Sequence, residues 1–311
     1  MRSILLFGLL IVATSCTHTH VEAPRNPANN LINTAGIISD VDDTIRISYT
    51  GGGFQNKILV FLTKESFIGQ SDLYNGVLQQ TEQSAPTMAF VSAAPGKEAP
   101  GNSLEKKFYG ILSNTVHGLI KKFNFPQKYT LDMAPEPYGK ISDRKEKLKK
   151  VISYKVKAAE SRIIDGITYS LYGDDTEADH LAYAQMVKNA PQKISNVFIH
   201  KVKGIESIPV GLLYYTAFEP ALVEYSEGRL SRADLLKIGQ KLLDPNIDFE
   251  KVIPYFAVCP NPTKEKNWIS TLAQSKKMTD PEIIHTAALL EANIHYYCSI
   301  RNEARQLNTK Q

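Results

Sequence analysis

The chain has 311 residues, of which 43% are hydrophobic and 22% are charged, a composition that is ordinary for a soluble globular protein. This length suits one large domain, or one domain with an appendage. The formal net charge of +4 is small for the length, so it argues against a nucleic-acid-binding protein and against an acidic tail.

The N-terminus has the pattern of an export signal. Arg2 precedes an apolar run over residues 4–12, which is too short to span a bilayer as a mature helix. Small residues and then Cys16 follow, so the segment resembles a bacterial lipoprotein signal, which is cleaved before a cysteine that then carries lipid. A leucine is usual where Ala13 stands. We expect a signal peptide over residues 1–15 and a lipid anchor at Cys16; the alternative is an ordinary secretory signal.

The next segment, residues 16–34, is rich in Thr, Asn and Pro and is predicted to be a flexible tether. We therefore expect an exported protein. A membrane lipoprotein that faces the periplasm fits the pattern best, and a periplasmic or secreted protein is the alternative.

The first predicted strand ends in clustered carboxylates. An apolar run over residues 36–38 leads through Ser39 into Asp40, Asp42 and Asp43. This pattern predicts a buried parallel strand that ends at an active site. Carboxylates packed this closely repel one another unless a cation or a proton relieves them. The cluster therefore predicts a divalent metal site, and ligands that are all oxygen favour Mg²⁺.

Two further predicted strands, residues 88–92 and 167–172, also lead into polar side chains, Ser92 and Asp174. Strands that alternate with helices imply a parallel sheet with helices on both faces, in which ligands bind beyond the carboxyl ends of the strands. We therefore predict a Rossmann-like α/β fold. The other elements expected before residue 204 are helices over residues 71–80, 104–122 with a break near 113–114, 143–157 and 177–189, and strands over residues 129–132 and 196–200.

The chain changes character at residue 204. Helices are predicted over residues 221–225, 232–243, 264–274 and 281–305, with little clustered acid or serine chemistry. We predict a helical C-terminal extension over residues 204–311 that packs on the sheet domain. Cys259 and Cys298 could pair in an exported protein, but the sequence leaves their geometry open.

The residues at the strand ends suggest phosphate chemistry. Of Asp40 and Asp42, one carboxylate could attack while the other transfers protons across the same reacting atom. Asp174 and Asp179 would complete a magnesium site that holds a phosphate near anionic side chains. Ser92 could donate a hydrogen bond to a phosphoryl oxygen, and a lysine in the first turns of the third predicted helix could neutralise further charge.

These segments resemble motifs of the haloacid dehalogenase (HAD) superfamily. Residues 39–45 are similar to its first motif, Asp-x-Asp-x-Thr, and residues 91–95 to its second, a hydrophobic strand that ends in Ser or Thr. Residues 173–179 are similar to its fourth motif, Gly-Asp-x-x-x-x-Asp. The closer resemblance, over residues 35–200, is to the phosphatidate phosphatase branch found in yeast actin-patch proteins and in many bacteria. We therefore place a phosphatase domain of the HAD type over residues 35–203.

The resemblance implies roles for the first motif. Asp40 matches the nucleophile, which is also a metal ligand. Asp42 matches the general acid and base, and its backbone carbonyl would also bind the metal. Thr44 matches the threonine that supports the loop. Asp43 belongs to the branch pattern, but no chemical step can be assigned to it.

The resemblance also implies roles for the later motifs. Ser92 matches the phosphate-binding residue, and Asp174 matches the metal ligand of the fourth motif, with Asp179 as its partner. The lysine of the family is assigned to Lys145, because it lies nearer the positive end of its helix than Lys147, the alternative. The spacing from Lys145 to Asp174 is longer than the family pattern.

Two departures from the branch pattern concern the neighbours of these residues. Ala93 and Ala94 stand where the branch has Asn-Ser, so contacts with the substrate there would differ. Asp175 stands where the branch has a serine, which would add a negative charge beside the metal.

We therefore predict an Mg²⁺-dependent phosphomonoester hydrolase that acts through an aspartyl-phosphate on phosphatidate or a related lipid phosphate, held at the membrane by an N-terminal lipid anchor. One alternative is an exported enzyme that acts on soluble phosphate esters. Another is a non-catalytic lipoprotein that binds phospholipid. Transfer of the phosphoryl group to an acceptor other than water is a third. No nucleic-acid partner is expected, and no protein partner can be named.

Overall fold

A computed structural model of the chain describes residues 34–48, 64–79 and 88–308. Residues 33–311 form one compact unit. The predicted signal peptide, Cys16 and almost all of the predicted tether lie outside the described residues. Among the described residues, no helix has the length and apolar character that a membrane crossing requires.

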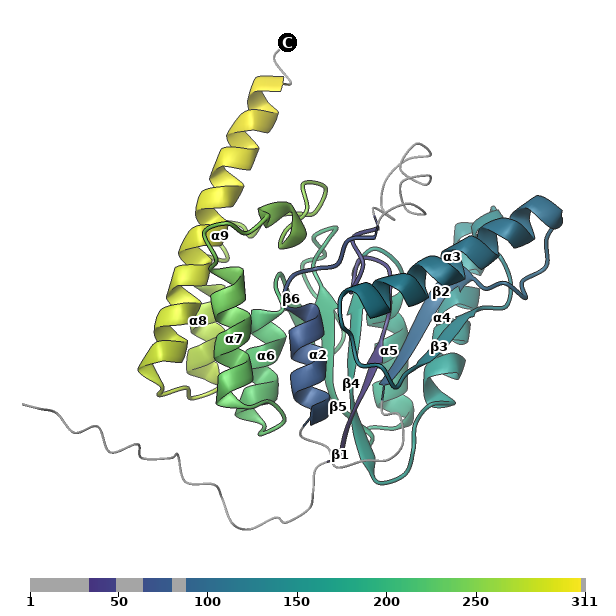
Figure 1. The fold of residues 1–311 in the computed structure, drawn as a ribbon, viewed down its shortest axis with the longest axis horizontal. Coiled ribbons are helices and arrows are strands. Elements are labelled where there is room, and N and C mark those ends of the chain that lie inside the picture. The colour runs from purple at the N-terminus through teal and green to yellow at the C-terminus, as the bar shows by residue number, and fades with distance from the viewer. Residues whose placement is uncertain (1–33, 49–63, 80–87, 309–311) are drawn as a thin grey trace, which may run out of the picture. The chain divides into compact units, whose positions relative to one another are not determined.

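The core of the unit is a six-stranded sheet in the order β3-β2-β1-β4-β5-β6, and every neighbouring pair is parallel. Figure 1 shows the strands rising toward the end of the molecule at which β1 leads into residues 40–48. The predicted parallel α/β fold is confirmed. The strands are β1 Thr34–Ser39, β2 Met88–Pro95, β3 Thr130–Ala134, β4 Ile167–Asp174, β5 Ile194–His200 and β6 Leu212–Tyr214.

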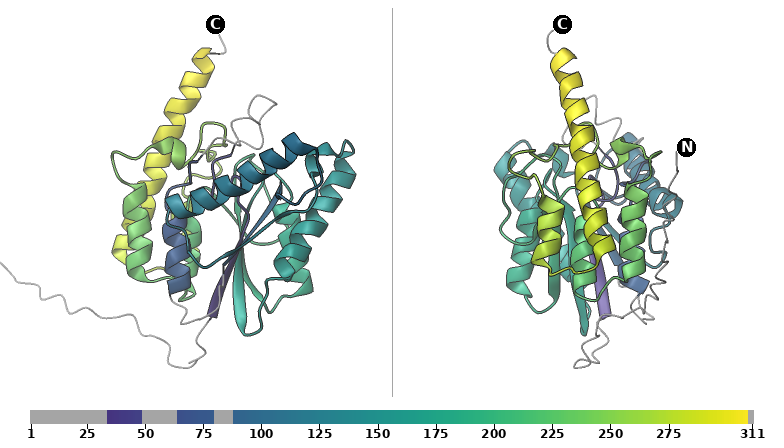
Figure 2. Two further views of the ribbon diagram at one scale, coloured as in Figure 1. Left: turned by 45° about the vertical axis from the view of Figure 1, so that its right-hand side comes forward. Right: turned by 90° about the vertical axis from the view of Figure 1, so that its left-hand side faces the viewer.

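Helices cover both faces of the sheet, and Figure 2 shows them on either side of the strands. One face carries the larger hydrophobic core, to which α2, α3 and the C-terminal helices contribute, and the other face packs against α4 and α5. The α-helices are α2 Gln70–Gln79, α3 Ser103–Lys122, α4 Arg144–Glu160, α5 Asp179–Asn189, α6 Phe218–Ser226, α7 Arg232–Leu242, α8 Trp268–Ser275 and α9 Pro281–Asn308, with short 3-10 helices η1 Tyr138–Lys140 and η2 Phe249–Lys251.

The central strand β1 explains why the sheet is covered on both sides. Ile37 belongs to the core of one face and packs with α2 and α3, whereas Ile38 belongs to the core of the other face. Both side chains are fully buried. A strand that is apolar on both faces is stable only between two layers of helices. The short apolar run that predicted β1 therefore also predicted the three-layer arrangement.

The structure differs from the sequence prediction in two elements. The segment after residue 203, predicted to be wholly helical, begins with β6, which pairs with β5 through Phe198↔Leu212 and His200↔Tyr214. A three-residue strand at a sheet edge is too short to show a period of two. The helix predicted to break near residues 113–114 continues without interruption as α3.

Two other details complete the fold. Asp143 is the N-cap residue of α4, because its side chain accepts hydrogen bonds from the backbone of Lys145 and Glu146. Cys259 and Cys298 form a disulfide, which ties the segment after η2 to α9.

Strand register brings the predicted site residues to one edge. Ser39 of β1 lies beside Phe90 of β2 and Tyr172 of β4. Asp40 therefore lies level with the residues that lead to Ser92 and Asp174. The carboxyl ends of three adjacent strands thus meet, as the sequence predicted.

Candidate active site

Asp40 continues the line of β1 by one residue. Its backbone N–H donates a hydrogen bond of 2.8 Å to the carbonyl oxygen of Tyr172, so the pairing with β4 holds its backbone in place. The hydroxyl of Ser39 donates to the carbonyl of Asp40 at 2.6 Å and lies 2.8 Å from the hydroxyl of Tyr74. Asp40 is 3% exposed. The carboxylate is therefore both buried and held on a rigid element.

Lys155 is the cation of the site. Its Nζ donates to Asp40 Oδ1 at 2.9 Å and also to Asp179 Oδ1, and it lies 3.7 Å from Glu177 Oε2. The Lys155 side chain is 1% exposed, so burying its charge is costly unless the carboxylates compensate it. A lysine in this position also places a positive charge where a bound phosphate would carry negative charge.

The structure corrects the assignment of the lysine. Lys145 lies in the first turn of α4, is exposed, and has its backbone N–H bonded to Asp143; it is Lys155, nearly three turns further along α4, that reaches the carboxylates. A signal was present in the sequence, because Lys155 lies four residues from both Val151 and Ala159 on the buried face of α4. The spacing from Lys155 to Asp174 is also shorter than the spacing from Lys145 to Asp174, which is longer than the family pattern.

Asp174 ends β4, and Asp179 opens α5. Asp174 Oδ1 accepts a hydrogen bond of 2.5 Å from the backbone of Thr176, whereas its Oδ2 is buried and has no hydrogen-bond partner among the described residues. Asp179 Oδ2 accepts from the backbone of Asp174 at 3.2 Å. The two residues are 1% and 0% exposed, respectively. A buried carboxylate oxygen without a donor is costly, and a bound cation would remove that cost.

The carboxylates fit a hard divalent cation. Asp40, Asp174 and Asp179 each offer an oxygen, and these oxygens lie within 4.8 Å of one another. Oxygen ligands with at least two negative charges suit Mg²⁺ better than softer metals. The donor set and the unpartnered Oδ2 of Asp174 therefore agree with a metal site, as the strand-end carboxylates predicted.

The electrostatics of the cluster follow from its burial. Burial raises the pKa of the Asp40 carboxyl well above its usual range, and the charges of Asp179 and Asp42 add to the rise, while Lys155 opposes it. Burial likewise raises the pKa of Asp174, together with the charges of Asp179 and Asp40. Burial alone would lower the pKa of Lys155, but Asp179 and Asp40 outweigh it and raise that pKa. Lys155 therefore stays charged, and a further cation would help both aspartates to ionise.

Asp42 faces a different partner. Its Oδ1 lies 3.2 Å from Nε of Arg46, whose side chain is fully buried, whereas the Asp42 side chain is 14% exposed. Residues 41–46 form a tight loop, in which Ile45 N and Arg46 N both donate to the carbonyl of Val41. The loop and Arg46 thus hold the Asp42 carboxylate in place, and its side chain is more exposed than that of Asp40.

Ser92 and Thr44 lie at the same edge. Ser92 is 1% exposed, and its Oγ accepts a hydrogen bond of 3.1 Å from the backbone of Ala94. Thr44 is also 1% exposed, and its hydroxyl has no hydrogen-bond partner among the described residues. The hydroxyl hydrogen of Ser92 thus remains available to a phosphoryl oxygen.

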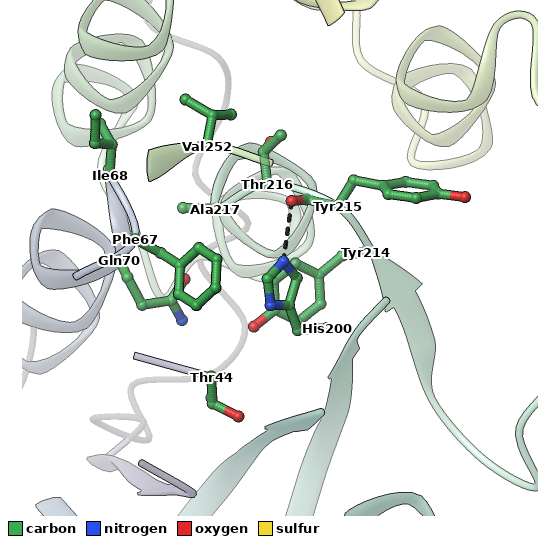
Figure 3. A pocket seen from close by; sticks show the side chains of 10 residues that line it. All are labelled: Thr44, Phe67, Ile68, Gln70, His200, Tyr214, Tyr215, Thr216, Ala217 and Val252. Atoms are coloured by element: carbon green, nitrogen blue, oxygen red, sulfur yellow. Dashed lines mark hydrogen bonds between the residues drawn. The ribbon is translucent and has the colours of Figure 1, made fainter. Parts of the chain in front are cut away.

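Asp43, to which no chemical step could be assigned from the sequence, has a structural role. Its φ is +57°, its Oδ1 accepts from Ser48 N at 2.9 Å, and its carbonyl lies 2.8 Å from Nδ1 of His200. His200 is buried at the end of β5, and its Nε2 lies 3.2 Å from the carbonyl of Tyr215, the contact drawn in Figure 3. The contact between Asp43 and His200 therefore fixes the loop of residues 41–46, which carries Asp42, to the end of β5.

The carboxylate of Asp175, which the sequence predicted to add a negative charge beside the metal, is bound by backbone donors. Its Oδ1 accepts hydrogen bonds from the backbones of Val202 and Lys203, and its Oδ2 accepts from Gly204 and Ile205, all at 2.6–2.9 Å. Four backbone donors compensate one carboxylate. The residue that departs from the branch pattern thus organises the loop after β5.

Figure 3 shows a small cavity beside this loop, with the rings of His200 and Tyr214 stacked against each other. Thr44, Gln70 and His200 are among its lining residues, and its volume of about 10 Å³ holds about one water. It is too small for a substrate.

The site contains carboxylates that can attack phosphorus, exchange protons and hold a divalent cation. It also contains a lysine and a serine that can bind an anion. Together these groups define an enzyme that processes phosphate esters. The family comparison agrees: the chain belongs to the family described as "Phosphatidate phosphatase APP1, catalytic domain", whose model matches residues 35–201, more than half of the chain. This membership indicates a phosphatase. No significant match was found among curated proteins or among solved structures. The wider relation to the HAD superfamily stays a prediction.

Proposed function

We propose that the protein hydrolyses phosphatidate or a related lipid phosphate, with Mg²⁺ as its cofactor and an aspartyl-phosphate as its intermediate. The observation that carries the proposal is the buried cluster in which Lys155 joins Asp40 to Asp179 beside Asp174. The family membership supports the phosphate monoester and the lipid as substrate.

Asp40 is the proposed nucleophile. A carboxylate oxygen of Asp40 attacks the phosphorus, and the bond from phosphorus to the lipid oxygen breaks. Asp42 donates a proton to the departing oxygen, because it lies two residues further on and is the more exposed carboxylate. The products of this step are a diacylglycerol, or its equivalent for another lipid, and phosphorylated Asp40.

The second step regenerates the enzyme. Asp42, now ionised, removes a proton from a water molecule as the water oxygen attacks the phosphorus. The bond from phosphorus to Asp40 then breaks, and inorganic phosphate leaves. Arg46 holds the Asp42 carboxylate in position, since its Nε lies 3.2 Å from Asp42 Oδ1.

Ser92 and Lys155 are proposed to hold the phosphoryl oxygens. The Ser92 hydroxyl can donate a hydrogen bond, and the Lys155 ammonium supplies charge in a site with little access to water, where such charge acts strongly. Asp40, Asp174 and Asp179, with the backbone carbonyl of Asp42, would hold Mg²⁺. When bound, the ion offsets the repulsion between the phosphate and these carboxylates.

The experiment that tests this function is phosphate release by the purified protein from phosphatidate in mixed micelles and from soluble phosphate esters. Activity that requires Mg²⁺, stops with a chelator and prefers phosphatidate supports the proposal. A preference for soluble esters would favour the exported acid-phosphatase alternative. Tight phosphatidate binding without turnover would favour the non-catalytic lipoprotein.

We propose further that the protein is exported and anchored to a membrane by lipid on Cys16. The apolar segment over residues 4–12 supports export. The Cys259–Cys298 disulfide supports an oxidising compartment. Mass spectrometry of the mature protein tests this, because processing at Cys16 would give a diacylated N-terminal cysteine, whereas an ordinary secretory signal would leave no lipid.

A further inference from the structure

The N-terminal half of α3 exposes a row of large apolar side chains. Leu104, Phe108 and Ile111 are 63%, 45% and 53% exposed, respectively. Their spacing of four and three residues places them on one face of the helix. Single exposed apolar residues are ordinary, but three in register on one helix make a surface that is commonly an interaction site. We refer to these three residues as the α3 stripe.

The α3 stripe faces the same end of the sheet as the catalytic cluster. Lys122 lies eighteen residues, or five full turns, after Leu104, so both point from the same face of α3. The Nζ of Lys122 donates to the carbonyl of Lys64 at 3.0 Å and lies 3.4 Å from Glu65. The next residue, Ser66, forms an antiparallel β-bridge with Arg46, in the loop of residues 41–46 that follows Asp40. This face of α3 is therefore turned toward the carboxyl edge of the sheet.

The start of α3 is fixed at that edge. The helix follows the carboxyl end of β2, and a capping box formed by Asn102 and Glu105 holds its first turn. The carboxylate of Glu105 also forms an ion pair of 2.6 Å with Lys140 of η1, which directly precedes α4. The ion pair thus ties the first turn of α3, on one face of the sheet, to the segment that leads into α4 on the other face.

The first turns of α4 are strongly basic. Four cations, Arg144, Lys145, Lys147 and Lys149, are exposed and form no ion pair among the described residues. Glu146 is the one acid among residues 144–149. Lys147 is also close enough to Glu177 for its charge to act on that carboxylate, and Glu177 lies 3.7 Å from Lys155. The basic surface therefore extends from the exterior toward the catalytic cluster.

We propose that the α3 stripe inserts into a lipid surface while the basic start of α4 binds anionic headgroups, so that the carboxyl edge of the sheet is held against the bilayer that contains the substrate. This inference rests on the proposed function, because a long-chain phosphatidate stays in a membrane. Apolar residues beside exposed lysines and arginine are the composition of interfacial membrane-binding surfaces. A protein partner would satisfy the stripe, but would leave the uncompensated charge of α4 unexplained.

Vesicle sedimentation tests the proposal without depending on turnover. Protein that begins at Asn33, where the compact unit begins, excludes any contribution from the apolar N-terminal segment. Phosphatidylcholine vesicles with and without phosphatidate are used in the presence of a chelator. Changing Leu104, Phe108 and Ile111 together to Gln is expected to weaken vesicle binding roughly 10- to 100-fold. Changing Arg144 and Lys149 to Gln is expected to weaken binding only to the anionic vesicles, and added salt is expected to mimic that change.

The matched control changes Ile284 and Leu289 of α9 to Gln. Both residues are exposed to a similar degree, 44% and 41%, but belong to the first turns of α9, away from the catalytic edge. This control is expected to bind vesicles as the parent protein does. The docking surface would be overturned if the α3 variant bound vesicles as well as the parent protein does. It would also be overturned if the α9 variant lost as much vesicle binding as the α3 variant, or if the parent protein did not bind vesicles.

Kinetics separate this inference from the proposed function. The α3 variant is expected to lose turnover of long-chain phosphatidate in vesicles but to keep turnover of a short-chain phosphatidate in free solution. If the parent protein turns over neither substrate while the α3 variant still loses vesicle binding, the proposed function fails and the docking surface stands. If both substrates are turned over equally by the α3 variant and the parent, the docking surface fails and the function stands.

Discussion

Buried carboxylates occur in two regions of the molecule, and they are stabilised in different ways. In the C-terminal helices, Glu219 accepts from Tyr215 N at 2.8 Å and from Trp268 Nε1 at 3.0 Å, and Glu291 accepts from Ile269 N at 2.6 Å. At the catalytic edge, two aspartates, Asp40 and Asp179, share Lys155, and an oxygen of Asp174 has no partner among the described residues. Carboxylates with dedicated N–H donors hold the fold, whereas carboxylates that share one cation are arranged for chemistry.

The largest expected effect is at Asp40. Asp40→Asn keeps the shape of the side chain but removes the proposed nucleophile, so we expect phosphatase activity to fall by about 10⁴-fold or more while the protein stays folded. Phosphate release and circular dichroism measure the two effects. Undiminished activity in this variant would exclude the aspartyl-phosphate mechanism.

The second effect contrasts two lysines of α4, the buried Lys155 and the exposed Lys145. Lys155→Met leaves buried aspartates without their cation, so we expect activity to be lost and the free energy of unfolding to fall by about 3–5 kcal/mol. Lys145→Met is the matched control and should change that free energy by under about 0.5 kcal/mol, because Lys145 is exposed. Urea unfolding with and without Mg²⁺ is the measurement, and Mg²⁺ should stabilise the Lys155 variant more than the parent. Equal stability of the two variants would contradict the assignment of Lys155.

The third effect concerns the buried carboxylates of the C-terminal helices, which have dedicated N–H donors. Glu219→Gln places an amide against backbone and indole N–H donors, so we expect the free energy of unfolding to fall by about 1–3 kcal/mol. Activity well below the melting temperature should not change, because Glu219 belongs to the C-terminal helices. A loss of kcat in fully folded protein would show that the distinction between the two kinds of carboxylate is wrong.

The smallest effect concerns pH. Burial and neighbouring charges raise the folded-state pKa of Asp174, so the folded protein binds more protons there than the unfolded chain does. The stability that this group contributes is present below its ordinary carboxyl pKa and is lost as the pH rises through the raised value. In metal-free protein, Asp174→Asn should therefore stabilise the fold at neutral pH and have less effect in acid. Urea unfolding in chelator at several pH values tests this, and a destabilised variant at neutral pH would contradict it.

The sequence predicted those parts of the site that depend on local pattern. Asp40, Ser92 and Asp174 each follow an apolar strand, and strands in a parallel sheet end at one edge, so their meeting could be expected. The position of Lys155 depends on which face of α4 is buried, and a basic helix shows that face weakly. The role of Asp175 depends on a loop that no local pattern specifies.

The Asp175 loop has a consequence for how far the catalytic module can be separated from the rest of the chain. The family model ends at residue 201, but all four backbone donors to Asp175 follow at residues 202–205, and β6 closes the sheet after them. The carbonyl of Tyr215 then contacts His200, which contacts the loop of Asp43. The segment that the family model matches is therefore not a portable unit in this chain. A protein cut at residue 201 would leave the buried carboxylate of Asp175 without its donors, so any transplant of this activity must carry the chain through at least Tyr215.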